Sequence, residues 1–254
     1  MFREEEFATL ADWFEGPLGV HVLTAELEFL DARLPQLYGF HLMQLSVCKG
    51  LRLANSSMIR HRFVLARSTT TPGVSACAYP EQLPIDGDCI DVALLHHVLE
   101  YSHQPHQLLR EAARVVVPHG HLFVLGFNPW SLFGARAALS RHFTVHPVWQ
   151  GAALAARRVR DWLELLDFAV EDIQYRVHIP PIDHAVTLTR LAATDRAATR
   201  WKLPAGAIYM IHARKQLGML TPVRNARWAM RPRLAALPLA SPSARNALQY
   251  RICA

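Results

Sequence analysis

Cysteine is scarce in this chain of 254 residues. The four copies are scattered, and no two of them form a C-x-x-C pair. Disulfide frameworks belong to small secreted proteins with closely spaced cysteines, whereas isolated thiols are typical of reducing compartments. We therefore expect a reduced, cytoplasmic protein.

Long hydrophobic runs are also absent. No stretch approaches the roughly 18 consecutive apolar residues of a membrane-spanning helix. The first residues, MFREEEF, are acidic and lack the apolar core of a secretory signal peptide. The sequence therefore predicts no membrane insertion.

Acidic residues are missing from the end of the chain. Residues 222–254 contain six arginines and no aspartate, glutamate or lysine. The rest of the chain holds 21 basic against 21 acidic residues, so this segment accounts for the whole net charge of +6. Its prolines exclude a long helix, so we predict a largely irregular basic tail over residues 218–254. A nucleic acid or acidic partner is expected only through this tail.

Short apolar runs predict the strands of a sheet. Four such runs occupy residues 40–47, 62–66, 90–95 and 121–127. Runs of this length without polar alternation are typical of strands buried on both faces of a parallel sheet. An amphipathic segment beginning near Pro105 joins the last two runs, which predicts a right-handed βαβ unit. We expect the four runs to be neighbouring parallel strands.

The same region carries an ordered set of motifs: LPIDGDCID at 83–91, HHVLEY at 96–101, and EAARVVVPHG at 111–120 followed by HLFVL. This set resembles class I S-adenosylmethionine-dependent methyltransferases of the type 11-like branch, which act mostly on small molecules. The resemblance implies a doubly wound, mostly parallel, seven-stranded Rossmann-like α/β sheet over residues 36–217, with helices on both faces. A βαβ unit of another doubly wound fold is the alternative.

Residues 1–35 form a predicted helical extension. Apolar residues recur at three- and four-residue spacings, and Gly16 and Pro17 divide the segment into a short arm and a longer helix. Such a helix either covers one end of the sheet or, as in members of the resembled family, forms a lid over the substrate site.

The resemblance implies an S-adenosylmethionine site at the carboxyl ends of the strands. The residues expected around it are Leu45, Ser46, Gly50, Ala66, Arg67, Glu81, Gln82, Leu83 and His96. The motif is degenerate, because only Gly50 remains of the glycine-rich turn and the second strand ends in Ala66 instead of an acid. Glycine allows the backbone to approach a cofactor closely, and an acid would accept hydrogen bonds from the ribose. We therefore expect weak cofactor affinity.

His96 and His97 follow a central strand and are the candidate general bases, because imidazole titrates near neutral pH. The alternative is that His97 packs inward and His96 is solvated. Asn128 and Trp130 follow the next strand and are candidates for a substrate pocket. The alternative for Trp130 is a packed residue at the start of a helix.

His96, His97, His103 and His106 also suggest zinc by their proximity, and H-x-x-H is a ligand spacing. No cysteine or acid completes a credible ligand set, and Pro105 separates His103 from His106. We therefore expect no metal site.

Two functions follow from the resemblance. The first is an S-adenosylmethionine-dependent methyltransferase acting on a small molecule, in which the cofactor's sulfonium carries the reactive methyl group and the protein aligns the acceptor. The second is a catalytically inactive methyltransferase-fold protein that serves as a binding or scaffold module.

Overall fold

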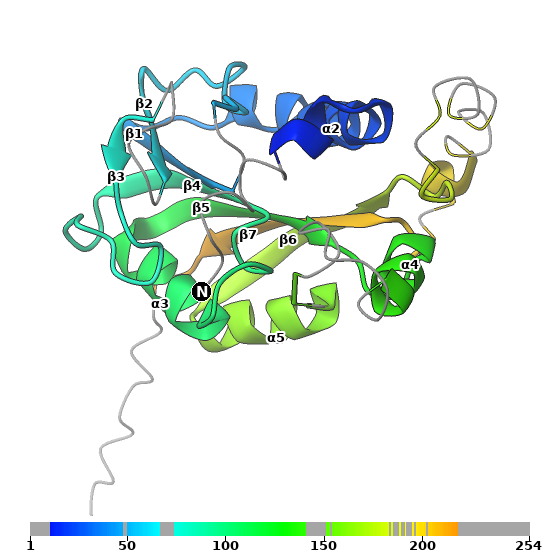
Figure 1. Ribbon diagram of the computed structural model, residues 1–254. Coiled ribbons are helices and arrows are strands. Elements are labelled where there is room, and N and C mark those ends of the chain that lie inside the picture. The colour runs from blue at the N-terminus through cyan, green and yellow to red at the C-terminus, as the bar shows by residue number, and fades with distance from the viewer. Residues whose placement is uncertain are drawn as a thin grey trace, which may run out of the picture. The chain divides into compact units, whose positions relative to one another are not determined.

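A computed structural model of the protein describes residues 11–217, except for 48–49, 67–73, 141–150, 153, 183, 185–187, 189–190, 192–194, 196 and 202. A seven-stranded sheet with the order β3-β2-β1-β4-β5-β7-β6 forms the centre of this part (Figure 1). The strands are β1 (His41–Ser46), β2 (His61–Ala66), β3 (Ala76–Cys77), β4 (Ile90–His96), β5 (Val116–Phe127), β6 (Phe168–Arg176) and β7 (Ile208–Lys215). Strand β7 runs antiparallel to β5 and β6, on its two sides, and the other neighbouring pairs of the described sheet are parallel. The mostly parallel, seven-stranded fold predicted from the sequence is confirmed.

The four apolar runs are neighbouring parallel strands, as predicted, in the order β2-β1-β4-β5. Strand β5, however, begins at Val116 and not at residue 121. Val116 already pairs with Ile90, and the register shifts before β4 and β5 continue side by side. The Pro118–Gly120 segment therefore lies inside an irregular strand.

Helices cover both faces of the sheet. Helices α3 (Pro105–Val115) and α5 (Ala156–Leu165) lie on one face, and α2 (Pro17–Asp31) lies on the other (Figure 1). The described part also contains η1 (Leu34–Gln36) and α4 (Leu132–Ser140). Helix α3 buries the apolar stripe expected from its sequence, which includes Leu108, Leu109, Ala112, Ala113 and Val115.

The N-terminal helical segment bends at Gly16, where its sequence predicts a division. Residues 11–15 are helical, Gly16 is a bend, and α2 begins at Pro17. A Cβ atom on Gly19 would lie 2.1 Å from the carbonyl oxygen of Trp13, so only glycine permits this close approach. The ring of Phe29 then packs edge-on against Phe123 of β5, with 6.2 Å between centroids. This packing fixes α2 on the sheet.

Residues 50–60, which lead from β1 to β2, contain no helix or strand. The side chain of Gln44 holds this connection: its Nε2 donates to the Leu51 carbonyl at 2.6 Å, and its Oε1 accepts from the Leu53 N–H at 3.0 Å. Within the described ranges, no helix has the length and apolar character needed to cross a membrane. The predicted basic tail, 218–254, lies outside the described residues.

Candidate functional site

Two histidines lie where β4 ends at the carboxyl edge of the sheet. His96 is the last residue of β4 and pairs in register with Ser46, whose hydroxyl oxygen lies 2.9 Å from Nδ1 of His96. His97 adopts a left-handed conformation with φ of 55°, which is uncommon for a residue with a side chain. In a continuing strand the two side chains would point to opposite faces. The left-handed step instead brings the imidazole centroids within 4.7 Å of each other.

Helix α2 adds a carboxylate to the two histidines. Glu26 Oε2 lies 3.1 Å from Nε2 of His96, and Glu26 Oε1 lies 2.9 Å from Nε2 of His97. Glu100 Oε2 lies 3.2 Å from Nδ1 of His97, and Glu100 Oε1 accepts a hydrogen bond from the Phe127 N–H. Glu26, His96 and His97 have no accessible surface, and Glu100 is 3% exposed. We call these four residues the buried cluster.

Aromatic rings close the buried cluster against solvent. The Phe14 centroid lies 5.4 Å from that of His96 and 5.6 Å from that of His97, and Phe127 lies 4.2 Å from His97. Phe14 reaches this position because the chain bends at Gly16. All four ring nitrogens of the two histidines already face Ser46, Glu26 or Glu100. In this arrangement neither imidazole presents a free nitrogen to an outside substrate, and the catalytic role of His96 and His97 stays a prediction.

Charge within the buried cluster is distributed unevenly. Burial raises the pKa of Glu26, but the two imidazoles outweigh burial and lower the pKa to about 2. Burial lowers the pKa of His97, but Glu26 and Glu100 outweigh it and raise the pKa to about 10. For His96 burial prevails and its pKa is lowered, whereas burial raises the pKa of Glu100. In a metal-free protein at neutral pH, Glu26 is therefore a carboxylate, His97 an imidazolium and His96 neutral.

Sequence reasoning missed Glu26, although a signal was present. Leu18, Val22, Glu26 and Leu30 recur at four-residue intervals and are all buried on α2. When such an apolar row is buried, a carboxylate within it needs a hydrogen-bonding or charged partner, because burying an unpaired charge is unfavourable in free energy. The pattern indicates a buried ion pair but does not identify its partners, which lie 70 and 71 residues away.

The other two histidines of the predicted group do not join the buried cluster. His103 and His106 are exposed, and the ring of His106 lies against Trp162, with 3.6 Å between centroids.

The residues predicted to bind the cofactor differ in accessibility. Leu45, Ser46 and Leu83 are buried, whereas Gly50 and Gln82 are exposed and Ala66 is half-buried. Glu81 is half-buried and accepts a hydrogen bond from the Ser102 hydroxyl at 2.7 Å. Arg67 lies outside the described residues. The role of these residues in cofactor binding remains a prediction.

Asn128 and Trp130 differ from each other in accessibility. Asn128 is buried, and its Nδ2 donates to the carbonyls of Pro204 and Gly206 at 3.0 and 2.9 Å. Its Oδ1 accepts from the Trp130 N–H at 3.1 Å, so the amide connects two chain segments. Trp130 is 79% exposed and its indole is available for contact with a ligand.

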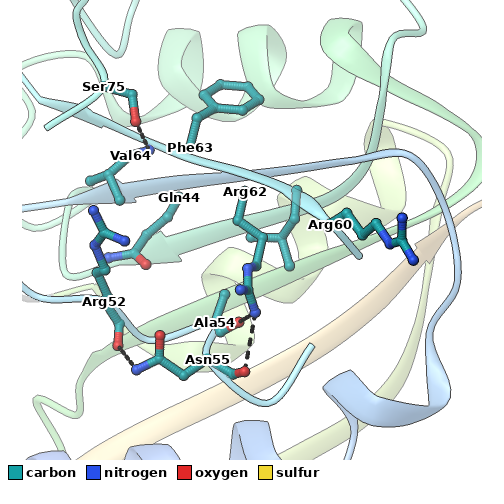
Figure 2. Close-up of a pocket in the computed structure, with 10 residues that line it drawn as sticks. Gln44, Arg52, Ala54, Asn55, Arg60, Arg62, Phe63, Val64 and Ser75 are labelled. Carbon is teal, nitrogen blue, oxygen red and sulfur yellow. Dashed lines mark hydrogen bonds between the residues drawn. The ribbon is translucent and has the colours of Figure 1, made fainter. Parts of the chain in front are cut away.

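A pocket of about 210 Å³ lies over β1 and β2 and contains none of the predicted cofactor residues (Figure 2). Its lining residues are Leu42, Gln44, Arg52, Ala54, Asn55, Arg60, Arg62, Phe63, Val64 and Ser75. The Arg62 guanidinium donates to the carbonyls of Ala54, Asn55 and Ser57 and so holds the 54–57 loop. In the described part of the chain, no carboxylate pairs with Arg52 or Arg60, and their charges favour an anionic group.

Comparisons with known proteins agree with this geometry. The profile of the family described as a methyltransferase domain matches residues 54–124, which span β2 to β5. The Escherichia coli (strain K12) protein YafS, itself described as uncharacterized, is 31% identical over 169 residues, 66% of this chain and 69% of YafS. The chain belongs to the class I S-adenosylmethionine-dependent methyltransferases.

Solved methyltransferase structures share the fold. One chain of the complex between the Haloferax volcanii Trm112 methyltransferase activator and a methyltransferase aligns with a TM-score of 0.60 and 19% identity, covering 84% of this chain and 97% of its own. An S-adenosylmethionine-dependent methyltransferase from Thermotoga maritima aligns with a TM-score of 0.56 and 18% identity, covering 76% and 89%. S-adenosylmethionine is the cofactor of this methyltransferase family.

The described residues of this methyltransferase do not reproduce the usual cofactor contacts. Leu45 and Ser46 end β1 and Val47 follows it, where the family places its glycine-rich turn, and β2 ends in Ala66 without a carboxylate. At the ends of β1 and β4, Ser46 and His96 bond to each other, and Glu26 fills the space beside them. At the ends of β1 and β4, protein side chains therefore bind one another.

Proposed function

We propose that this protein is a methyltransferase that uses S-adenosylmethionine to methylate a small molecule. The observation that carries the proposal is the joined β4–α3–β5 unit, residues 90–127, set in a sheet of methyltransferase order. The family match, which covers residues 54–124, supports it. Open α/β sheets bind ligands outside the carboxyl ends of their strands, so both reactants belong at this edge.

Within this proposal, the cofactor contacts residues 45–47, 50, 66 and 81–83. The acceptor lies beside Trp130, whose exposed indole follows the carboxyl end of β5. An aromatic ring at the rim of a pocket offers apolar contact to a small molecule. Because the buried cluster is closed, the methyl acceptor is expected to be a nucleophile that does not depend on His96 or His97 as its base.

A methyltransferase-fold binding protein without turnover is the second candidate. The specific observation in its favour is the pairing of Glu26 with His96 and His97, which occupies the ends of β1 and β4. The absent acid at Ala66 points the same way, since ribose hydroxyls lose their charge-assisted partner. The two candidates differ in whether the cofactor binds at all.

Calorimetric titration of the full chain with S-adenosylmethionine and S-adenosylhomocysteine distinguishes the two candidates. For the methyltransferase we expect a dissociation constant above about 1 μM, weaker than a fully formed site provides. Ala66→Asp is expected to tighten binding about tenfold by restoring a ribose acceptor. No binding of either compound up to about 1 mM would overturn the proposal and favour the second candidate.

A further inference from the structure

Donor atoms of three residues of the buried cluster lie close together. Nε2 of His96 and Nε2 of His97 both face the Glu26 carboxylate, each opposite a different oxygen, at 3.1 and 2.9 Å. One donor atom of each residue lies within 4.8 Å of the other two. Ligands about 2.0–2.2 Å from a zinc ion in a tetrahedral site are separated by roughly 3.3 Å, close to these spacings. The two imidazoles and the Glu26 carboxylate would supply three protein ligands.

The outward nitrogen of each imidazole is also held. Nδ1 of His96 faces the Ser46 hydroxyl at 2.9 Å, and Nδ1 of His97 faces Glu100 Oε2 at 3.2 Å. Metal-bound histidines almost always donate their second ring N–H to a hydroxyl, carbonyl or carboxylate, which fixes the tautomer that ligates. In each imidazole, one nitrogen thus faces the proposed metal position and the other is held by a hydroxyl or a carboxylate. This is the arrangement expected of metal-binding histidines.

Charge balance favours a cation in the same place. Glu26 and Glu100 are both inside the protein, and buried carboxylates are stable only when their charge is compensated. A divalent ion between Glu26 and two neutral imidazoles would balance both carboxylates at once. Imidazole nitrogen suits zinc and other transition metals better than magnesium or calcium.

We propose that Glu26, His96 and His97 bind a divalent transition metal ion, zinc in particular, that fastens helix α2 to the carboxyl ends of β1 and β4. From the sequence no metal was expected, because nothing near the histidines completed a ligand set; Glu26 of α2 supplies the missing ligand from 70 residues away. All three ligands are inaccessible, so the ion enters as the protein folds and has a structural role.

A second group of possible ligands does not share this geometry. His212 faces Glu171 with Nδ1 at 3.4 Å and His121 with Nε2 at 3.0 Å. Because opposite nitrogens of one ring point to the two neighbours, a single ion cannot be bound by all three residues in this arrangement. His121→Gln is therefore a matched control for substitutions in the buried cluster.

The test uses tag-free, full-length protein refolded with one equivalent of ZnCl₂ or CoCl₂ after chelator treatment. We expect one zinc per chain to remain after dialysis and visible ligand-field bands with cobalt. Glu26→Gln and His96→Gln should abolish both signals, and Ser46→Ala should weaken affinity about tenfold. His121→Gln should leave the metal content unchanged.

If the refolded wild-type protein retains no zinc, the inference is wrong. It is also wrong if His121→Gln loses the metal while His96→Gln retains it. If the ligand variants do not fold, anomalous diffraction at the zinc edge from crystals of the wild-type protein decides. A peak among Glu26, His96 and His97 supports the site, and a peak elsewhere or none refutes it.

Discussion

Replacing Glu26 by glutamine tests whether the buried cluster holds α2 on the sheet. The carboxylate makes two hydrogen bonds, of 2.9 and 3.1 Å, to imidazoles that have no solvent exposure. Glutamine preserves the shape but removes the charge, so His97 keeps only Glu100 as its anionic partner. Breaking a buried pair in this way costs roughly 3–5 kcal/mol. We expect the lower end, about 3 kcal/mol, because the amide retains one hydrogen bond.

The measurement is urea denaturation with a chelator present, so that no ion contributes. A loss of about 3 kcal/mol corresponds to a melting temperature lower by about 6–12 °C for a domain of this size. Glu28→Gln is the matched control on the same helix, because Glu28 is exposed and lies 3.7 Å from Arg176. Such surface pairs contribute about 0–1 kcal/mol.

The loss of stability caused by Glu26→Gln should also depend on pH. The pKa of Glu26 is lowered to about 2 from 4.5, so its contribution is present above pH 4.5 and is lost as the pH falls through 2. The pKa of His97 is raised to about 10 from 6.5, so its contribution is complete below pH 6.5 and is lost as the pH rises through 10. The difference between wild type and E26Q is therefore largest between pH 4.5 and 6.5. A difference no larger than that of Glu28→Gln at every pH would refute the reasoning.

Three further predictions concern other parts of the chain. Burial lowers the pKa of His212 to about 4 from 6.5, so wild type should lose up to about 3 kcal/mol of stability as the pH falls from 6.5 to 4, whereas His212→Phe should show a flatter profile by urea denaturation. Asn128→Ala should lower the free energy of unfolding by about 2–3 kcal/mol, because it leaves buried carbonyls without donors. The control Asn55→Ala, at an exposed residue, should change it by less than about 0.5 kcal/mol. Equal losses in the two variants would contradict the role assigned to Asn128. Deleting residues 222–254 should abolish salt-sensitive binding to heparin and leave the melting temperature unchanged; aggregation of the truncated protein would show instead that the segment is structural.

The parallel core of the sheet was predictable from local pattern. Four short apolar runs and one amphipathic segment were enough to order β2, β1, β4 and β5 and to place α3, because periodicity encodes which faces of an element are buried. The early start of β5 was not predictable, because Val116 belongs to the strand only through its pairing with Ile90. Pairing partners lie on another strand and leave no local signal.

The chemistry of the site depended on contacts between distant segments. The sequence placed His96 and His97 at the carboxyl edge, but their burial follows from Phe14 and Glu26, which arrive with the N-terminal helical segment. From the sequence, Asn128 was a candidate to bind a ligand, but in the structure its amide donates to the carbonyls of Pro204 and Gly206. Local sequence determines what a side chain can bind; only the tertiary structure decides which partner reaches it first, because burial and charge pairing are set by residues far away along the chain.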